Sequence, residues 1–308
     1  MLEQTVQIVC NERDTDSYFR LVVRAPRIAP LIQPGQFAHI RMLPMKNALL
    51  RRPFSIFQVS SDTFSILYKT VGQGTEVLSQ MQAGEELSVI APLGHGFTVP
   101  KRGGETPLLV AGGYGMAAMY MLAQRSPQKG IVFVGGRRRV DILCEKEFEA
   151  LGWEVRVTTE DGSRGKKGLV TDLLLVELRR NAAQLKNYHP ARSSRGNEAQ
   201  TKKSKLNQSL LSSAATNRKV KIYACGPTGM LKAVGKIAEE FKVPAELSMD
   251  EHMCCGVGVC LTCVIPVKTG DGPGRAEAHE REGGWEYQRT CTEGPVFDSR
   301  RVVWEVVK

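Results

Sequence analysis

Residues 255–263 read CGVGVCLTC, which places three cysteines at C-x4-C-x2-C spacing, and Cys291 follows on a later segment. This spacing with a distant fourth cysteine is the plant-type pattern for a 2Fe–2S cluster. Gly256 and Gly258 favour a loop that folds back tightly, because glycine permits the backbone angles that point amides at sulfur atoms. The predicted cluster ligands are therefore Cys255, Cys260, Cys263 and Cys291.

The spacing alone leaves other uses of these cysteines open. Zinc sites favour paired C-x2-C knuckles, and here only Cys260 and Cys263 form one. A disulfide framework is typical of small secreted domains. This chain has 308 residues and begins MLEQ, without the basic and apolar regions of a secretory signal. Cys254 as first ligand would give C-x5-C, so Cys255 is preferred, although adjacent thiols can exchange roles.

Length and composition indicate a globular protein with two or three domains. The chain is 42% hydrophobic and 24% charged, which is ordinary for a folded protein. No stretch approaches the roughly 20 apolar residues of a membrane span. Eight cysteines, half of them in one cluster motif, suit a reducing cytosol. We therefore expect a cytoplasmic protein without a membrane partner.

The formal net charge of +10 raises the question of nucleic-acid binding, but the distribution of that charge argues against it. Much of the excess lies between Arg179 and Lys221, where many basic residues face a single acid, Glu198. The stretch has little hydrophobic periodicity, so we predict a mobile insert or solvated loop at about residues 181–218. A basic tether for RNA, a membrane or an acidic partner surface is the alternative; no nucleic-acid partner is expected.

The N-terminal third reads as short strands separated by turns. Alternating or β-branched and aromatic residues mark strands at 5–9, 18–24, 36–41, 64–69 and 87–90. Strands at this spacing, with turn signals between them, predict a small antiparallel β-barrel.

Two motifs within the predicted barrel suit a flavin dinucleotide. In the RRPFSI motif, the Arg52 guanidinium can bind a pyrophosphate, the Phe54 ring can lie against a ring of the ligand, and the Ser55 hydroxyl can reach a flavin heteroatom. Gly74 and Thr75 stand at a predicted helix start, where backbone amides can bind phosphate. The alternative for the first motif is a strand end with a surface arginine.

An α/β domain is predicted after a Gly- and Pro-rich junction. The apolar run at 107–111 reads as a buried parallel strand. Gly113, Gly115 and Ala118 then fit G-x-G-x-x-A, a strand-to-helix dinucleotide turn. The next strand ends in GGRRR and not in the acid that a full fingerprint places on the ribose, so the glycines alone are weak evidence.

Further α/β units complete this domain. We predict one helix over 141–150, another capped by Thr171 or Asp172, and a strand at 220–224 that leads into Cys225-Gly-Pro. This last turn falls at the carboxyl edge of the sheet, where ligands bind in open α/β folds.

The order of these motifs resembles that of the ferredoxin–NADP reductase superfamily: Arg-Pro-Phe-Ser, then Gly-Thr, then Gly-Gly-x-Gly, then Cys-Gly-Pro. The cysteine motif followed by EGPVF at 293–297 is similar to one branch, the electron transfer subunits of class 1B dihydroorotate dehydrogenases. The resemblance spans nearly the whole chain except the stretches near 181–218 and 269–284, the second of which we expect to be an exposed loop.

The expected architecture is a multidomain protein of the α+β and α/β classes. It comprises an N-terminal antiparallel β-barrel for FAD at 1–101, a central parallel-sheet α/β nucleotide domain at 102–244, and a small C-terminal 2Fe–2S domain at 245–308.

The resemblance implies sites for FAD and NAD(H) beside the cluster. FAD would be held by Arg52, Pro53, Phe54, Ser55, Leu67, Tyr68, Lys69, Gly74 and Thr75. NAD(H) would be held by Gly112, Gly113, Gly115, Gly226 and Pro227. Ser55 and Cys225 are the expected catalytic positions, with Cys225 near the nicotinamide. Phe54 stands where the wider superfamily often has Tyr, and the basic run Arg137–Arg139 could accept a 2′-phosphate, which leaves NAD against NADP open.

The resemblance also implies a partner and a relay in de novo UMP biosynthesis. Dihydroorotate is oxidised at the FMN of a separate catalytic subunit, electrons pass singly through the cluster to FAD, and FAD returns a hydride to NAD+. We expect a heterotetramer with the cluster near the partner surface. The alternative is a flavin and iron–sulfur subunit of a ferredoxin:NADP or sulfide-type reductase, a branch with Asp in a related motif where Cys255 stands here. A non-enzymatic interaction module is a further alternative, against which the intact set of four thiols argues.

Overall fold

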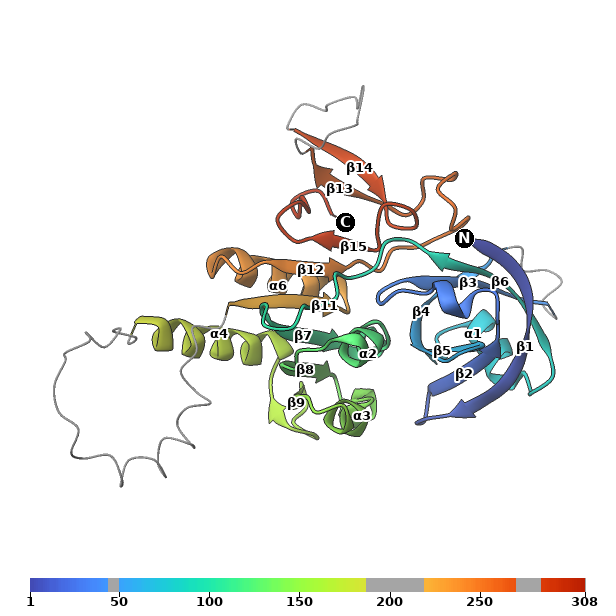
Figure 1. Cartoon of the computed structure of the whole chain (residues 1–308), viewed down its shortest axis with the longest axis horizontal. Coiled ribbons are helices and arrows are strands. Elements are labelled where there is room, and N and C mark those ends of the chain that lie inside the picture. Colours follow the sequence, from blue (N-terminus) through green and yellow to red (C-terminus); the bar gives the residue numbers. More distant parts are fainter. Residues whose placement is uncertain (44–49, 187–218, 270–283, 308) are drawn as a thin grey trace.

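A computed structural model of the chain describes residues 1–43, 50–186, 219–269 and 284–307. A β-barrel lies beside a mostly parallel sheet flanked by helices, and the C-terminal segment lies against both (Figure 1). This arrangement confirms the predicted fold class.

The barrel is built from β1 (Leu2–Arg13), β2 (Tyr18–Arg24), β3 (Phe37–Met42), β4 (Arg52–Val59), β5 (Thr63–Lys69) and β6 (Glu86–Leu93). Its antiparallel strands close in the order β1-β2-β5-β4-β3-β6. Side chains alternate between the two faces of each strand, so Leu21, Ile40 and Ile56 fill the core. The helix α1 (Gln73–Gln80) buries Leu78 in the same core.

The second sheet contains β7 (Thr106–Gly112), β8 (Ile131–Gly136), β9 (Glu154–Thr159), β10 (Lys166–Lys167), β11 (Val220–Cys225), β12 (Ala245–Ser248) and β15 (Val296–Asp298). These seven strands follow the order β10-β9-β8-β7-β11-β12-β15, and only the last pair, β12 with β15, is antiparallel. The switch point of the strand order therefore lies between β7 and β11.

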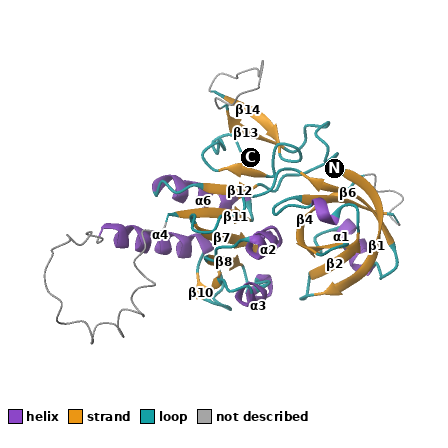
Figure 2. Ribbon diagram, viewed as in Figure 1, coloured by secondary structure: helices purple, strands orange, loops and turns teal. Residues whose placement is uncertain are grey.

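Among the described residues, four helices cover the sheet (Figure 2): α2 (Met116–Arg125), α3 (Glu145–Ala150), α4 (Val170–Lys186) and α6 (Thr228–Glu240). Side chains of successive β7 residues point to opposite faces of the sheet. Leu109 joins the core that contains α2 and α3, whereas Val110 joins the core that contains α4 and α6. In the part of the chain that the structure describes, no helix is long and apolar enough to cross a membrane.

The C-terminal segment completes the sheet as well as carrying the cysteines. β13 (Val264–Lys268) and β14 (Trp285–Arg289) form a hairpin outside the main sheet. β12 and β15 both fall in the range 245–308 that the sequence assigns to a cluster domain, yet they pair with the nucleotide sheet. Trp304 also joins the core beneath α6. The domain boundaries themselves stay a prediction.

Local structure differs from the sequence-based prediction in three places. The predicted helix over 141–150 is wrong in its first half: Arg139–Asp141 form a 3-10 turn, and Cys144 adopts a left-handed φ of 58°, so α3 begins only at Glu145. Neither Thr171 nor Asp172 precedes α4. Asp172 instead lies within its first turn and accepts a hydrogen bond from the Leu169 amide at 3.0 Å.

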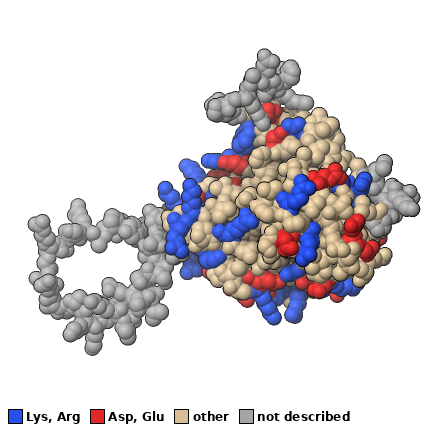
Figure 3. All heavy atoms as spheres, turned by 45° about the vertical axis from the view of Figure 1, so that its right-hand side comes forward, with Lys and Arg blue, Asp and Glu red and all other residues tan. Residues whose placement is uncertain are grey.

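Residues 181–186, which the prediction assigns to the basic insert, are helical instead, because α4 continues to Lys186. The rest of that insert, 187–218, and nearly all of the predicted loop at 269–284 lie outside the described residues. On the face shown in Figure 3, basic and acidic side chains are interspersed over most of the described surface.

Polar contacts join the barrel to the sheet domain. Asp141 accepts hydrogen bonds from Tyr18 Oη at 3.1 Å and from Lys69 Nζ at 3.2 Å. Arg20 pairs with Glu147 of α3 at 3.0 Å. Hydrogen bonds to a charged partner stabilise more than neutral ones do, so these contacts fix the angle at which the two parts meet.

Candidate functional site

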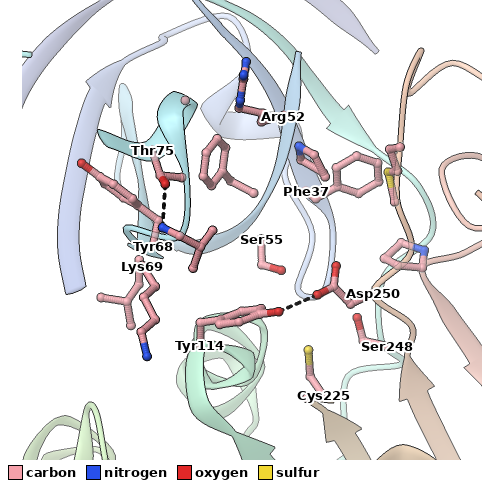
Figure 4. Close-up of a pocket in the computed structure, with 18 of the residues that line it drawn as sticks. Phe37, Arg52, Ser55, Tyr68, Lys69, Thr75, Tyr114, Cys225, Ser248 and Asp250 are labelled. Atoms are coloured by element: carbon pink, nitrogen blue, oxygen red, sulfur yellow. Dashed lines mark hydrogen bonds between the residues drawn. The ribbon is translucent and has the colours of Figure 1, made fainter. Parts of the chain in front are cut away.

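A cavity of about 490 Å³ lies where the barrel meets the carboxyl ends of β11 and β12 (Figure 4). Its barrel wall contains every residue predicted for FAD: Arg52, Pro53, Phe54, Ser55, Leu67, Tyr68, Lys69, Gly74 and Thr75. Cys225 and Gly226 line its other side. The structure thus brings together two motifs of the barrel and one of the sheet.

The start of α1 is shaped to accept the Arg52 side chain. A Cβ on Gly74 would stand 1.9 Å from Arg52 Nε, so any other residue here would push the guanidinium aside. Thr75 Oγ1 accepts hydrogen bonds from the amides of Val71 at 2.8 Å and Gly72 at 3.2 Å, which fixes the preceding loop. A guanidinium beside the amides of a helix start fits the diphosphate of a dinucleotide.

Aromatic rings form the wall next to this polar end. Phe54 meets Tyr68 edge to face at 5.9 Å, and Phe19 stacks behind Tyr68 at 5.5 Å. Burial raises the pKa of Tyr68 to about 12, and its hydroxyl donates to Asn11 Oδ1 at 3.0 Å. The wall is therefore neutral and apolar, which suits a flat aromatic ligand. Lys69 lines the cavity but directs its ammonium group to Asp141.

Cys225 forms the sheet side of the cavity at the end of β11. Its side chain is buried, and burial, followed by the negative charge of Asp250, raises the pKa of the thiol to about 12. The thiol is therefore neutral at physiological pH. It can contact a ligand ring, but it is not a thiolate nucleophile.

The glycine turn packs behind Cys225. A Cβ on Gly115 would lie 2.3 Å from the Cys225 carbonyl oxygen, and one on Gly112 would lie 3.0 Å from Pro227 Cδ. Gly113 has a φ of 55°, which favours glycine. The predicted nucleotide residues Gly112, Gly113, Gly115 and Pro227 thus gather beside the cavity, although none of them lines it.

Sequence reasoning missed part of the lining. Phe37, Tyr114, Ser248, Asp250 and Met253 also face the cavity. Of these residues, only Tyr114 could have been predicted from the sequence, because it occupies the variable position of the Gly-Gly-x-Gly turn. The others come from strand ends and a loop that only the tertiary fold brings together.

The cysteine loop wraps around the sulfur of Cys255. The amides of Val257 and Val259 donate to Cys255 Sγ at 3.4 Å each, and the amide of Cys260 does so at 3.5 Å. Gly256 and Gly258 make this possible with φ angles of 71° and 84°. Amides aimed at a sulfur are what a cluster thiolate requires, and this geometry supports Cys255 over Cys254 as first ligand.

Contacts join the four predicted ligands two by two: the Cys260 amide donates to Cys255 Sγ, and Cys263 and Cys291 share one buried apolar cluster. Hydrogen bonds from Thr262, followed by those with Cys255, lower the pKa of Cys260 to about 6. Burial and the neighbouring Cys263 raise the pKa of Cys291 to about 12. Two thiols for each of two irons is the ligation of a 2Fe–2S cluster. In the described part of the chain no three metal-binding side chains are grouped around one point, and none of the eight cysteines forms a disulfide.

A small apolar core connects the cysteines with the cavity. Cys263 and Cys291 are buried against Phe37 and Leu93 of the barrel, with Met253 packed at the edge. Phe37 and Met253 also line the cavity. The two sites therefore share a wall, to which Phe37 and Met253 belong.

Comparison with known proteins identifies the family. A model of the iron–sulfur cluster binding domain of dihydroorotate dehydrogenase B matches residues 250–303. The chain is 35% identical to the dihydroorotate dehydrogenase B (NAD+) electron transfer subunit of Desulforamulus reducens, over 91% of this chain and 90% of that one. It is 32% identical to the same subunit of Bacillus cereus, over 98% of this chain and all of the relative. The chain belongs to this family of electron transfer subunits.

Solved structures share the fold. An NADH-dependent reduced ferredoxin-NADP oxidoreductase, described for flavin-based electron bifurcation, superposes with a TM-score of 0.70 at 24% identity, covering 97% of this chain and 90% of the other. The cytochrome b5 reductase domain of Ulva prolifera nitrate reductase gives 0.56 at 15% identity, covering 78% and 94%. At these identities the likeness concerns the fold alone.

Membership of the dihydroorotate dehydrogenase B electron transfer family confirms several predictions. The chain is an electron transfer subunit of an oxidoreductase, and its residues 250–303 form an iron–sulfur cluster binding domain. The assignment of individual residues to FAD, to NAD(H) and to the cluster stays a prediction.

Proposed function

We propose that this subunit passes electrons between the FMN of a dihydroorotate dehydrogenase catalytic subunit and NAD+, in de novo pyrimidine biosynthesis in the cytoplasm. The observation that carries the proposal is the shared wall: Phe37 and Met253 contact both the cavity and the paired cysteines. Side chains that belong to both sites place the proposed cluster beside the proposed flavin, as transfer of single electrons between them requires. When bound, FAD converts between single electrons and a hydride.

The barrel side of the cavity is assigned to FAD. Arg52 and the amides at Gly74 and Thr75 bind the diphosphate, while Pro53, Leu67 and Lys69 complete the wall. Phe54 and Tyr68 flank the aromatic part of the ligand, and Ser55 orients the flavin by a hydrogen bond. The fit is supported by the space that Gly74 leaves for Arg52.

The sheet side is assigned to NAD(H). Gly112, Gly113 and Gly115 form the dinucleotide turn, and Gly226 and Pro227 continue the site from β11. The neutral Cys225 thiol orients the nicotinamide by contact. No side chain here needs to act as acid or base, because hydride transfer between a nicotinamide and a flavin moves the hydrogen with its electrons.

The cysteine loop is assigned to partner docking as well as cluster binding. Cys260 is exposed, and Val259 and Leu261 beside it are 79% and 61% exposed. Exposed apolar side chains around a redox centre favour a protein contact at that point. We propose that the catalytic subunit covers this loop and that two copies of each subunit form a heterotetramer.

The test is an anaerobic visible spectrum of the purified chain before and after NADH, with iron and acid-labile sulfide assays. We expect flavin and cluster bands that bleach with NADH, and about two irons per chain. A pull-down with the FMN subunit then tests the docking. Zinc in place of iron, or the lack of a flavin, contradicts the relay; bleaching without binding of the FMN subunit contradicts the partner and favours a ferredoxin-linked reductase.

A further inference from the structure

Tyr114 places an aromatic ring inside the cavity from the glycine turn. In Figure 4 its ring lies between Ser55 of the barrel and Cys225 of the sheet, and its hydroxyl points to Asp250. The hydroxyl donates a hydrogen bond to Asp250 Oδ2 at 2.8 Å. Partial burial, followed by the charge of Asp250, raises the pKa of the phenol, so it remains a neutral donor.

Two features leave this ring free to move. The side chain is 49% exposed, so no closely packed core surrounds it. It stands between Gly113, whose φ is 55°, and Gly115. Neither neighbour carries a side chain that could hold the ring in place. The bond to Asp250 is therefore a strong determinant of where the ring lies.

Hydride transfer requires the reacting atoms of two rings to approach to about 3–3.5 Å. Under the proposed function, the flavin lies against Ser55 and the nicotinamide enters beside Cys225. The Tyr114 ring lies between these two side chains. A nicotinamide that reaches the flavin must therefore displace it.

We propose that Tyr114, held by Asp250, is a displaceable gate that controls entry of the nicotinamide to the flavin. This inference rests on the proposed assignment of the cavity. Asp250 lies two residues after the end of β12, on the segment that leads to Cys255. The gate thus joins the glycine turn of the nucleotide domain to the chain that carries the cluster ligands.

If Tyr114 is such a gate, removing its ring should change the binding of NAD+ but not the binding of ADP-ribose. ADP-ribose retains the adenosine and diphosphate but lacks the nicotinamide, so it does not compete with the Tyr114 ring. The oxidised, FAD-loaded wild-type protein should bind NAD+ and ADP-ribose with similar dissociation constants. The reason is that the nicotinamide contributes little binding free energy while the Tyr114 ring occupies its place.

The experiment measures both dissociation constants by calorimetry for the wild type, Tyr114→Phe and Tyr114→Ala. Tyr114→Phe removes the bond to Asp250 and should tighten NAD+ binding several-fold, to about tenfold. Tyr114→Ala should tighten it at least as much. Binding of ADP-ribose should change less than twofold in both. Tyr120→Phe is the matched control, because Tyr120 lies on α2 outside the cavity lining, and it should change neither constant.

Three results overturn the gate. One is an NAD+ dissociation constant that stays within twofold in both Tyr114 variants while the wild type binds ADP-ribose, which leaves the proposed function standing. Another is equal tightening of ADP-ribose, which assigns the effect to the diphosphate site. The third is failure of the FAD-loaded wild type to bind either ligand, which removes the nicotinamide site and the gate together. FAD content and thermal unfolding check each variant, and the conservative Tyr114→Phe carries the test where Tyr114→Ala does not retain FAD.

Discussion

The imidazole of His39 lies directly against Gly256: a Cβ on residue 256 would stand 2.3 Å from His39 Nδ1. His39 is fully buried on β3 of the barrel, whereas Gly256 follows the first predicted cluster ligand. Packing against His39 of the barrel therefore constrains the conformation of the cysteine loop. Gly256 is needed both for this close approach and for its φ of 71°.

Gly256→Ala should consequently lower cluster occupancy. The methyl group forces either the loop or the buried imidazole to move, and a left-handed φ costs a further ~1 kcal/mol for a residue with a Cβ. We expect iron and labile sulfide per chain to fall by half or more, while FAD content is retained. Gly229→Ala is the control, because a Cβ there meets no atom within 4 Å. Full iron content in Gly256→Ala would show that the loop adapts.

Arg52→Gln should weaken FAD binding by about tenfold to a hundredfold, because a charge-assisted hydrogen bond contributes roughly 1.5–3 kcal/mol. Gly74→Ala should have a similar effect, since its methyl group occupies the place of the guanidinium. Quenching of flavin fluorescence by the deflavinated protein measures the dissociation constant. Arg51→Gln is the neighbouring control: Arg51 bonds to the Ser88 carbonyl and lies outside the cavity lining. Equal losses in both arginine variants would contradict the assignment.

The rate of flavin reduction by NADH should not depend on ionisation of the Cys225 thiol. The thiol pKa is raised to about 12 by burial and then by Asp250, so the group stays neutral through its ordinary value of about 8.5. Stopped-flow reduction rates of the wild type and Cys225→Ser should give parallel profiles from about pH 6 to 9, with Cys225→Ser slower by less than about tenfold. A step near pH 8.5 that disappears in Cys225→Ser would show that a thiolate takes part.

Asp141→Asn should loosen the junction of barrel and sheet domain. Burial acts to raise the pKa of the Asp141 carboxyl, but hydrogen bonds, that of Lys69 first, hold it below its usual value. A depressed folded pKa stabilises the protein above the unfolded pKa of about 3.9, and this contribution is lost as pH falls through the folded value. The free energy of unfolding in urea should fall by about 1–3 kcal/mol at pH 7, with a smaller difference from wild type below pH 4. Asp16→Asn, at an exposed position between β1 and β2, should leave it nearly unchanged.

The sequence was sufficient for much of this architecture because its signals are local. Alternation along each barrel strand follows from one buried face, and the apolar run that becomes β7 follows from burial on both faces. The candidate cluster ligands were readable for a similar reason, since three of them lie within nine residues of one loop.

What the sequence did not reveal depends on tertiary contacts. β15 is three residues long and is recognisable as a strand only because β12 lies beside it. Cys144 interrupts a helical pattern by adopting a left-handed φ. Its residue type does not predict this conformation. Phe37 and Asp250 come from a strand and a loop far apart in the chain, and their place in the cavity follows from how the barrel docks on the sheet domain.

Val259→Glu should weaken binding of the catalytic subunit without loss of the cluster. Val259 is 79% exposed beside the exposed Cys260, so a charge there is harmless in the free subunit but is desolvated in a complex that covers the loop. We expect the dissociation constant for the purified FMN subunit, measured by biolayer interferometry, to rise at least about tenfold, with iron content and NADH-dependent flavin reduction retained. Val176→Glu makes the same change at a 53% exposed valine on α4 and should leave the constant within about twofold. Undiminished binding of Val259→Glu would place the partner on a different face and require electrons to enter away from Cys260.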